Sequence, residues 1–133
     1  MSISEGPIAQ PERGEISARI SREIVQLHAR LYGRGPTKAR TFVEDDYVLS
    51  VLEEVFTTAE RTLIRVGNGD QVVSTRAAFQ DAVQDEFVSI VEQATGRKVR
   101  ALLCQVHLSE GVAMELFLLH GEPSSDGGPP LGA

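Results

Sequence analysis

The sequence predicts a two-layer α+β domain, and three observations lead to this fold class. Apolar residues recur at helical spacing in two long segments, and glycine ends each of them. Two pairs of β-rich runs are each separated by a short turn sequence, which is typical of β-hairpins. The order is helix, hairpin, short helix, long helix, hairpin (αββααββ). We therefore expect a four-stranded antiparallel sheet built from the two hairpins, with two long helices on one face and a short connecting helix.

The first helix is predicted from one apolar stripe. Its members recur at spacings of three or four residues: Ile16, Ile20, Ile24, Leu27 and Leu31. Gly33 ends this helix, and Pro36 prevents the helix from continuing beyond it. The first hairpin then follows, from β-rich runs at Ala39–Val43 and Tyr47–Val55 around an acidic turn.

The second half of the chain repeats this order. Thr57 and Glu60 form a capping-box pattern, which predicts a short helix over residues 58–66. A long amphipathic helix is expected from Val72 to Ala94, because apolar residues recur there at helical spacing and Gly96 follows.

The second hairpin joins Val99–Leu108 to Val112–Leu119 through a Ser-Glu-Gly turn. Both strands carry apolar residues at consecutive positions, which places apolar side chains on both faces of the sheet. Helices on one face would leave the other apolar face uncovered. We therefore expect a homodimer that forms through this second face.

Length and charge limit the function classes. The 133 residues suit one domain, expected over residues 14–120, and the Gly-, Pro- and Ser-rich composition predicts disordered tails over 1–13 and 121–133. A formal net charge of -6 argues against duplex nucleic acid as a partner. No apolar run is long enough for a transmembrane segment, and no signal sequence precedes the domain, so a cytoplasmic location is expected. The single Cys104 excludes an intrachain disulfide.

The stretch GRGPTKAR, residues 33–40, is the strongest candidate for a binding site. A helix end explains the first glycine and the proline, but it leaves Arg34, Gly35, Lys38 and Arg40 without a role. Exposed backbone amides beside cations can hold a small anion. The stretch follows a helix, whose C-terminal end repels anions, so such a site would depend on side chains alone.

Arg100, His28 and His107 are further candidate residues of the binding site. If the two αββ halves are related, Arg100 and its basic neighbours would lie at the same sheet edge and enlarge the anion site. His28 is expected to be a partly buried, hydrogen-bonded side chain, and His107 to bond a neighbouring loop. Glu115 stands in an apolar strand and needs a partner, for which Arg100 is suitable.

No motif for catalysis or for metal or cofactor binding appears in the sequence. We therefore expect a protein that is not an enzyme and that uses no metal or cofactor. Two alternatives remain open: a KH-like nucleic-acid or ribosome-associated module, and a hydrolase or lyase built on His28, Arg34 and His107.

Three stretches resemble the MpsC domain, named for a bacterial Na+-translocating membrane-potential-generating system. They are EIVQLHARLYGRGPTKARTFVEDDYVLSVLEEVFTTAERTL, FQDAVQDEFVSIVEQATGRKV and HLSEGVAMELFLL, within about residues 15 to 120. The resemblance implies a soluble accessory or regulatory partner of membrane components that couple sodium movement to inorganic-carbon uptake. It supplies no catalytic residues.

Overall fold

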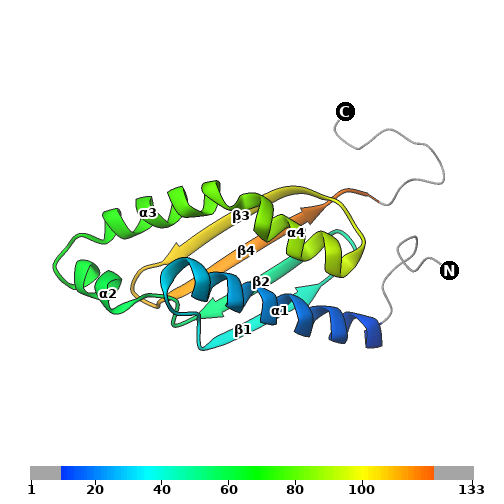
Figure 1. Cartoon of the computed structure of the whole chain (residues 1–133), viewed down its shortest axis with the longest axis horizontal. Helices are drawn as coiled ribbons and strands as arrows, with labels where there is room; N and C mark the ends of the chain where they lie inside the picture. The colour runs from blue at the N-terminus through cyan, green and yellow to red at the C-terminus, as the bar shows by residue number, and fades with distance from the viewer. Residues whose placement is uncertain (1–9, 122–133) are drawn as a thin grey trace.

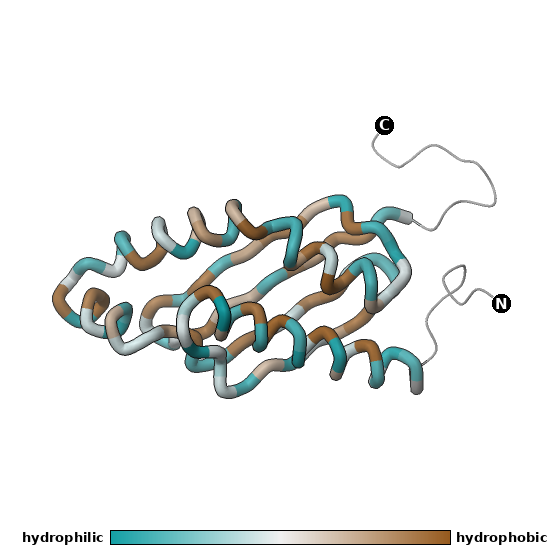
Figure 2. The backbone as a smooth tube through the Cα atoms, in the orientation of Figure 1, coloured by the Kyte–Doolittle hydropathy of each residue, from teal (hydrophilic) through white to brown (hydrophobic). Residues whose placement is uncertain are grey.

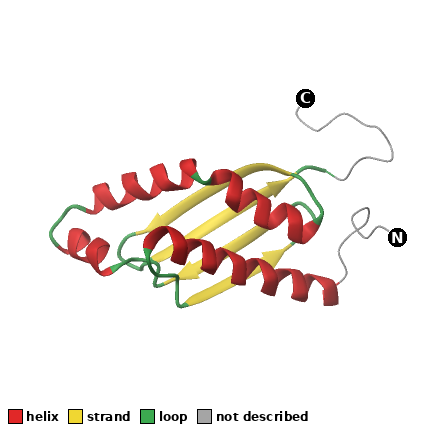
Figure 3. Cartoon of the chain, in the orientation of Figure 1, coloured by secondary structure: helices red, strands yellow, loops and turns green. Residues whose placement is uncertain are grey.

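The structure, a computed structural model, describes residues 10–121 as four helices and four strands. The strands form one antiparallel sheet in the order β1-β2-β4-β3 (Figure 1, Figure 3). The fold class predicted from the sequence is confirmed. In chain order the elements are α1 Gln10–Tyr32, β1 Lys38–Val43, β2 Tyr47–Glu53, α2 Thr58–Arg65, α3 Gly69–Ala82, α4 Gln84–Thr95, β3 Val99–His107 and β4 Val112–Leu119.

Helices α1 and α4 lie across the same face of the sheet, and the core is the layer between them and the strands (Figure 1). The apolar stripe of α1 enters this layer, because Ile20, Ile24 and Leu27 are at most 1% exposed. Figure 2 shows hydrophobic positions alternating with hydrophilic ones along both helices. Other large side chains of the core include Val48, Leu52, Phe87, Val91 and Phe117. Within residues 10–121, no helix has both the length and the hydropathy needed to span a bilayer.

Helix α1 begins at Gln10, before the boundary at residue 14 that the sequence suggested. Arg13 explains the longer helix, because its guanidinium donates to the Val43 carbonyl at 3.1 Å and lies 3.2 Å from the Glu44 carboxylate. The first helical turn is thereby tied to the β1–β2 turn. Residues 1–9 and 122–133 of the two predicted tails lie outside the described part of the chain.

The long helix expected from Val72 to Ala94 is two helices, α3 and α4. Val83 separates them with φ -117° and ψ 19°, outside the helical range. Helix α4 buries Phe87, Val91 and Thr95 in the core, whereas α3 buries only two residues and runs beside the edge strand β3 (Figure 1). The apolar spacing continues through Val83 because both helices face the sheet, and periodicity alone does not reveal the change of direction.

The face of the sheet opposite the helices is uncovered and apolar, as the sequence predicted. Its central row crosses all four strands in register, with Phe42 opposite Leu49, Leu49 opposite Leu116, and Leu116 opposite Leu103. Phe42 is 38% exposed and Leu103 is 51% exposed. A continuous apolar row on an open face is typical of an association surface.

Candidate functional site

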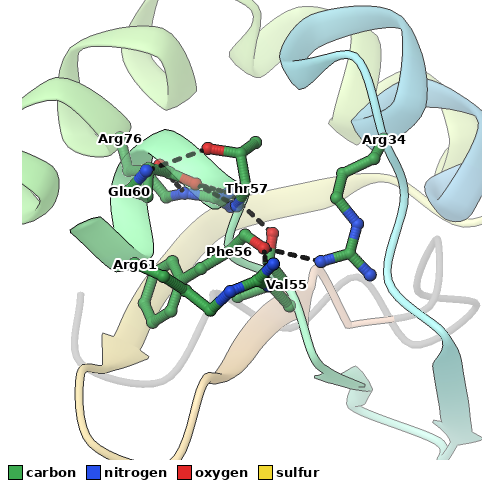
Figure 4. Close-up of polar contacts among 7 residues, drawn as sticks. All are labelled: Arg34, Val55, Phe56, Thr57, Glu60, Arg61 and Arg76. Atoms are coloured by element: carbon green, nitrogen blue, oxygen red, sulfur yellow. Dashed lines mark hydrogen bonds and ion pairs between the residues drawn. The ribbon is translucent and has the colours of Figure 1, made fainter. Parts of the chain in front are cut away.

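Two arginines from different elements converge on one backbone oxygen at the end of the sheet (Figure 4). Arg34, in the loop after α1, donates from Nη1 to the Phe56 carbonyl at 2.6 Å. Arg61, on α2, donates from Nη1 to the same oxygen at 2.9 Å. The segment between β2 and α2 is therefore held on both sides by guanidinium groups, which lie close to each other.

A third arginine, Arg76, also contacts the same segment. Arg76 on α3 is 5% exposed, and its Nε and Nη2 each lie 2.7 Å from an oxygen of Glu60. Its Nη2 also donates to the Val55 carbonyl at 2.8 Å, and the guanidinium carbon lies 3.9 Å from the centre of the Tyr32 ring. Such a bidentate, stacked arrangement suits arginine and not lysine.

Glu60 also completes the capping box predicted from the sequence. Its Oε1 accepts from the Thr57 amide at 2.9 Å, while its own amide donates to Thr57 Oγ1 at 3.1 Å. Burial opposes ionisation of Glu60, but the hydrogen bonds from Arg76 and from the Thr57 amide outweigh it. The pKa of the Glu60 carboxyl is consequently held below its ordinary value.

Arg34 and Arg61 border an open cavity of about 730 Å³, which we call the arginine cavity. Three cations line it, together with two carboxylates and the β3–β4 turn. Arg61 and Arg65 contribute from one face of α2, one turn apart. The lining residues are Arg34, Thr37, Glu54, Phe56, Arg61, Ile64, Arg65, Leu108, Ser109, Glu110 and Gly111.

Only part of the GRGPTKAR stretch reaches this cavity. Arg34 and Thr37 line it, whereas Lys38 and Arg40 lie on the uncovered face of β1, where the Arg40 guanidinium sits 5.1 Å from the Phe42 ring centre. Gly35 has a packing role, because a Cβ there would lie 2.9 Å from the Val25 carbonyl oxygen. The loop therefore needs glycine to fold back against α1.

The hypothesis that Arg100 joins this site is wrong. In the strand register, Lys38 lies opposite Glu53, Glu53 opposite Val112, and Val112 opposite His107. The beginning of β1 is therefore at the same end of the sheet as the end of β3. Arg100 stands near the beginning of β3 and thus at the opposite end of the sheet. The two hairpins meet through β2 and β4 at the centre of the sheet. In this arrangement the basic segments at the beginnings of β1 and β3 lie at opposite ends of the sheet, even if the two αββ halves are related.

His107 lies at the same end of the sheet as the arginine cavity but does not line it. Its Nδ1 accepts from the Glu110 amide at 3.3 Å, within the β3–β4 turn that directly follows it. His28 lies elsewhere, buried beneath α3. The structure therefore does not bring His28, Arg34 and His107 together as the hydrolase or lyase alternative requires.

The partner of Glu115 is His28 and not Arg100. His28 Nε2 lies 2.9 Å from Glu115 Oε2, and both residues are 2% exposed. The hydrogen-bonded state expected for His28 is confirmed. Arg100 occupies an irregularity of strand pairing between Val99 and Ala101, and its side chain is exposed. Among residues 10–121, no three His, Cys, Asp or Glu side chains gather closely enough to hold a metal ion.

Sequence analysis missed the roles of Arg61, Arg65 and Arg76. One signal was available: Arg76 stands four residues after Val72 and three before Phe79, within the apolar stripe. A cation in such a position predicts a buried partner of opposite charge. The convergence of Arg34 and Arg61 depends on how the loop after α1 meets α2, which local sequence does not specify.

The fold and the cavity define a two-layer α+β domain with a cation-lined cavity at one end of its sheet. The family model described as Na+-translocating membrane potential-generating system (MpsC) matches residues 12–121, and the chain belongs to this family. The matched region contains the loop after α1, the capping box and both hairpins. Comparisons with curated proteins and with solved structures found no match.

Proposed function

We propose that this domain is a non-enzymatic accessory module of a Na+-coupled membrane system that handles inorganic carbon, and that it binds a small oxyanion in the arginine cavity. Membership of the MpsC family supports the link to a Na+-translocating membrane system. A cytosolic location suits the single cysteine, which has no intrachain partner and would stay reduced there. A transporter component is the expected partner, and the bound anion would adjust that contact.

The observation that carries the anion proposal is the convergence of Arg34 and Arg61 on the Phe56 carbonyl. Within the described residues, neither guanidinium forms an ion pair with a carboxylate. Two neighbouring cations repel each other, and an oxyanion between them would remove that repulsion while accepting charge-assisted hydrogen bonds. Arg65 adds a third positive charge to the same cavity.

Calorimetric titration with inorganic phosphate and with bicarbonate tests this proposal. Each lost charge-assisted hydrogen bond weakens binding by roughly 10-fold, so a variant with Arg34→Gln and Arg61→Gln should bind at least ~10-fold more weakly. Lys38→Gln with Arg40→Gln is the matched control, because it removes the same number of charges from the uncovered face. Equal affinity in all three proteins, or no binding to the unaltered protein, would contradict the proposal.

A KH-like nucleic-acid module receives less support. The glycine-containing loop joins α1 to β1, whereas the GxxG loop of a KH domain joins two helices. The net charge of -6 also opposes binding to a polyanion. Titration with single-stranded RNA in the same calorimeter would detect this function as heat that falls steeply with added salt.

We also propose that the domain forms a homodimer through the uncovered face of the sheet. The apolar row of Phe42, Leu49, Leu116 and Leu103 crosses the middle of this face. A more polar row crosses the same face at one end of the strands, formed by Lys38, Glu53, Val112 and His107. An apolar centre with a polar rim is the usual composition of a protein interface, and two such faces can pack as in a β-sandwich.

Sedimentation velocity at several protein concentrations tests the dimer. Leu116→Arg places a charge at the centre of the proposed interface, so we expect the dimer to dissociate at least ~100-fold more readily. Gln93→Arg adds the same charge on the exposed surface of α4 and should leave the dimer intact. An unaltered protein that sediments as a monomer at every concentration would refute the dimer and leave the anion proposal untouched.

A further inference from the structure

A polar row crosses the buried face of the sheet between two apolar rows. Thr41 is opposite Ser50, Ser50 opposite Glu115, and Glu115 opposite Cys104, so all four strands contribute. Thr41 Oγ1 lies 2.9 Å from Ser50 Oγ and 2.8 Å from Ser21 Oγ of α1. The hydroxyl groups of this row thus have partners. Its one charged group is Glu115, close to the centre of the sheet.

The Glu115 carboxylate is only half satisfied. His28 occupies Oε2, whereas Oε1 has no hydrogen-bond partner among residues 10–121 and is buried. The whole residue is 2% exposed. A buried carboxylate oxygen without a donor is costly, because the lost hydration is not replaced. The imidazole bonds only Oε2, so Oε1 requires a donor in either protonation state of His28.

Glu115 lines a second cavity, of about 360 Å³, between α3 and the sheet. Arg76 also borders this cavity, but its charge is matched by Glu60. His28 holds Oε2 of Glu115, so Oε1 is the oxygen of this carboxylate that a ligand could engage. Much of the remaining wall is apolar. The lining residues are His28, Val73, Arg76, Ala77, Gln80, Cys104, Gln105, Val106, Leu108, Ala113, Met114 and Glu115.

We propose that this second cavity binds a small primary ammonium compound with a short alkyl chain. The ammonium group donates to Glu115 Oε1, while the alkyl chain lies against Val73, Ala77 and Val106. An anion would be repelled by the carboxylate, and a neutral alcohol would supply one hydrogen bond without the charge. The proposal uses none of the arginines that converge on the Phe56 carbonyl, so it stands apart from the oxyanion proposal.

Cys104 provides a built-in readout, because it lines the same cavity and is the chain's single cysteine. Desolvation and the nearby Glu115 carboxylate raise the pKa of the thiol to about 12, although part of the residue remains open to solvent. Its modification by methyl methanethiosulfonate should be slow, since the thiolate reacts. A ligand in the cavity should slow it further.

The test compares n-butylammonium, n-butanol and butyrate by their effect on this modification rate and by NMR titration. We expect n-butylammonium to bind and protect Cys104, n-butanol to bind at least ~10-fold more weakly, and butyrate not to bind. Butyrate binding as tightly as n-butylammonium would overturn the proposal. Failure of n-butylammonium to bind would do the same and would indicate that water alone occupies the cavity.

Two variants distinguish the contribution of the Glu115 carboxylate to binding from the contribution of the cavity's shape. Glu115→Gln should lose at least ~10-fold in n-butylammonium affinity while keeping its affinity for n-butanol, because an amide keeps the shape without the charge. Glu110→Gln in the arginine cavity is the matched control. If Glu115→Gln does not fold, Val73→Trp serves instead, since it fills the cavity from a side chain that is 41% exposed. Unchanged n-butylammonium binding in either folded variant would overturn the proposal.

Discussion

An Arg76→Met variant is expected to lose about 3–5 kcal/mol of unfolding free energy at neutral pH, because a buried ion pair is broken by removing one partner. Arg76 is 5% exposed and holds both oxygens of Glu60 at 2.7 Å. Methionine keeps much of the length and apolar stem but leaves Glu60 without its cation. The Val55 carbonyl also loses its donor.

The loss of unfolding free energy caused by Arg76→Met should decrease as the pH falls. The folded-state pKa of Glu60 is lowered, so the ionised carboxylate contributes stability above its unfolded pKa of about 4.3. That contribution disappears as the pH falls through the lower folded pKa. Urea denaturation should therefore show a difference between Arg76→Met and the unaltered protein that is constant near neutrality and shrinks in acid.

Arg30→Met is the control for this experiment. Arg30 pairs with Glu86 at 3.1 Å, but both side chains are about half exposed or more. Such a pair contributes about 0–1 kcal/mol. A similar loss in the two variants, or a difference that persists unchanged in acid, would show that Arg76 does not act through Glu60.

Phe117→Ala is expected to lose about 3–5 kcal/mol, the usual cost of removing a large aromatic side chain from a packed core. Phe117 is fully buried and lies opposite Val48 on one side and Leu102 on the other. The next residue, Leu118, points to the uncovered face, because successive side chains of a strand alternate.

Leu118→Ala is the matched control, and it should cost about 1 kcal/mol or less in the monomer. If the proposed dimer forms, the cost of Leu118→Ala rises with protein concentration, whereas that of Phe117→Ala keeps its large monomer contribution. Chemical denaturation at two protein concentrations measures both. Equal losses at low concentration would mean that the register of β4 is not the one described.

The fold class was predictable because its determinants are local. The stripe from Ile16 to Leu31, the acidic turn after Val43 and the Thr57–Glu60 capping box each specify an element within a few residues of themselves. Strand order and the helix break at Val83 were not predictable in this way. They depend on how the two hairpins pair through β2 and β4 and on where α3 meets the edge of the sheet.

The candidate site was predictable only in part, for the same reason. Arg34 was identified from an excess of cations that a helix end does not require, and it does line the arginine cavity. Lys38 and Arg40 do not, because alternation along β1 turns them to the uncovered face. The pairing of His28 with Glu115 joins residues 87 positions apart and follows from α1 crossing β4, which no local pattern encodes.

The sequence indicated that Gly35 has a role beyond ending the helix, but it did not indicate which role. The second glycine of GRGPTKAR is required by the structure, but for the close approach of the loop to Val25 and not for an exposed backbone amide. Close packing at Gly35 positions Arg34 over the β2–α2 segment. The glycine therefore supports the proposed anion site indirectly, through the path of the backbone.

If Arg34 and Arg61 hold an oxyanion, a crystal of the unaltered protein soaked in selenate should contain the ion between them. Selenium gives an anomalous signal that locates the ion without reference to its neighbours. We predict a peak in the arginine cavity within hydrogen-bonding distance of both guanidinium groups. No peak in that cavity, or a peak only beside Lys38 and Arg40 on the uncovered face, would mean that the arginine cavity does not bind an oxyanion.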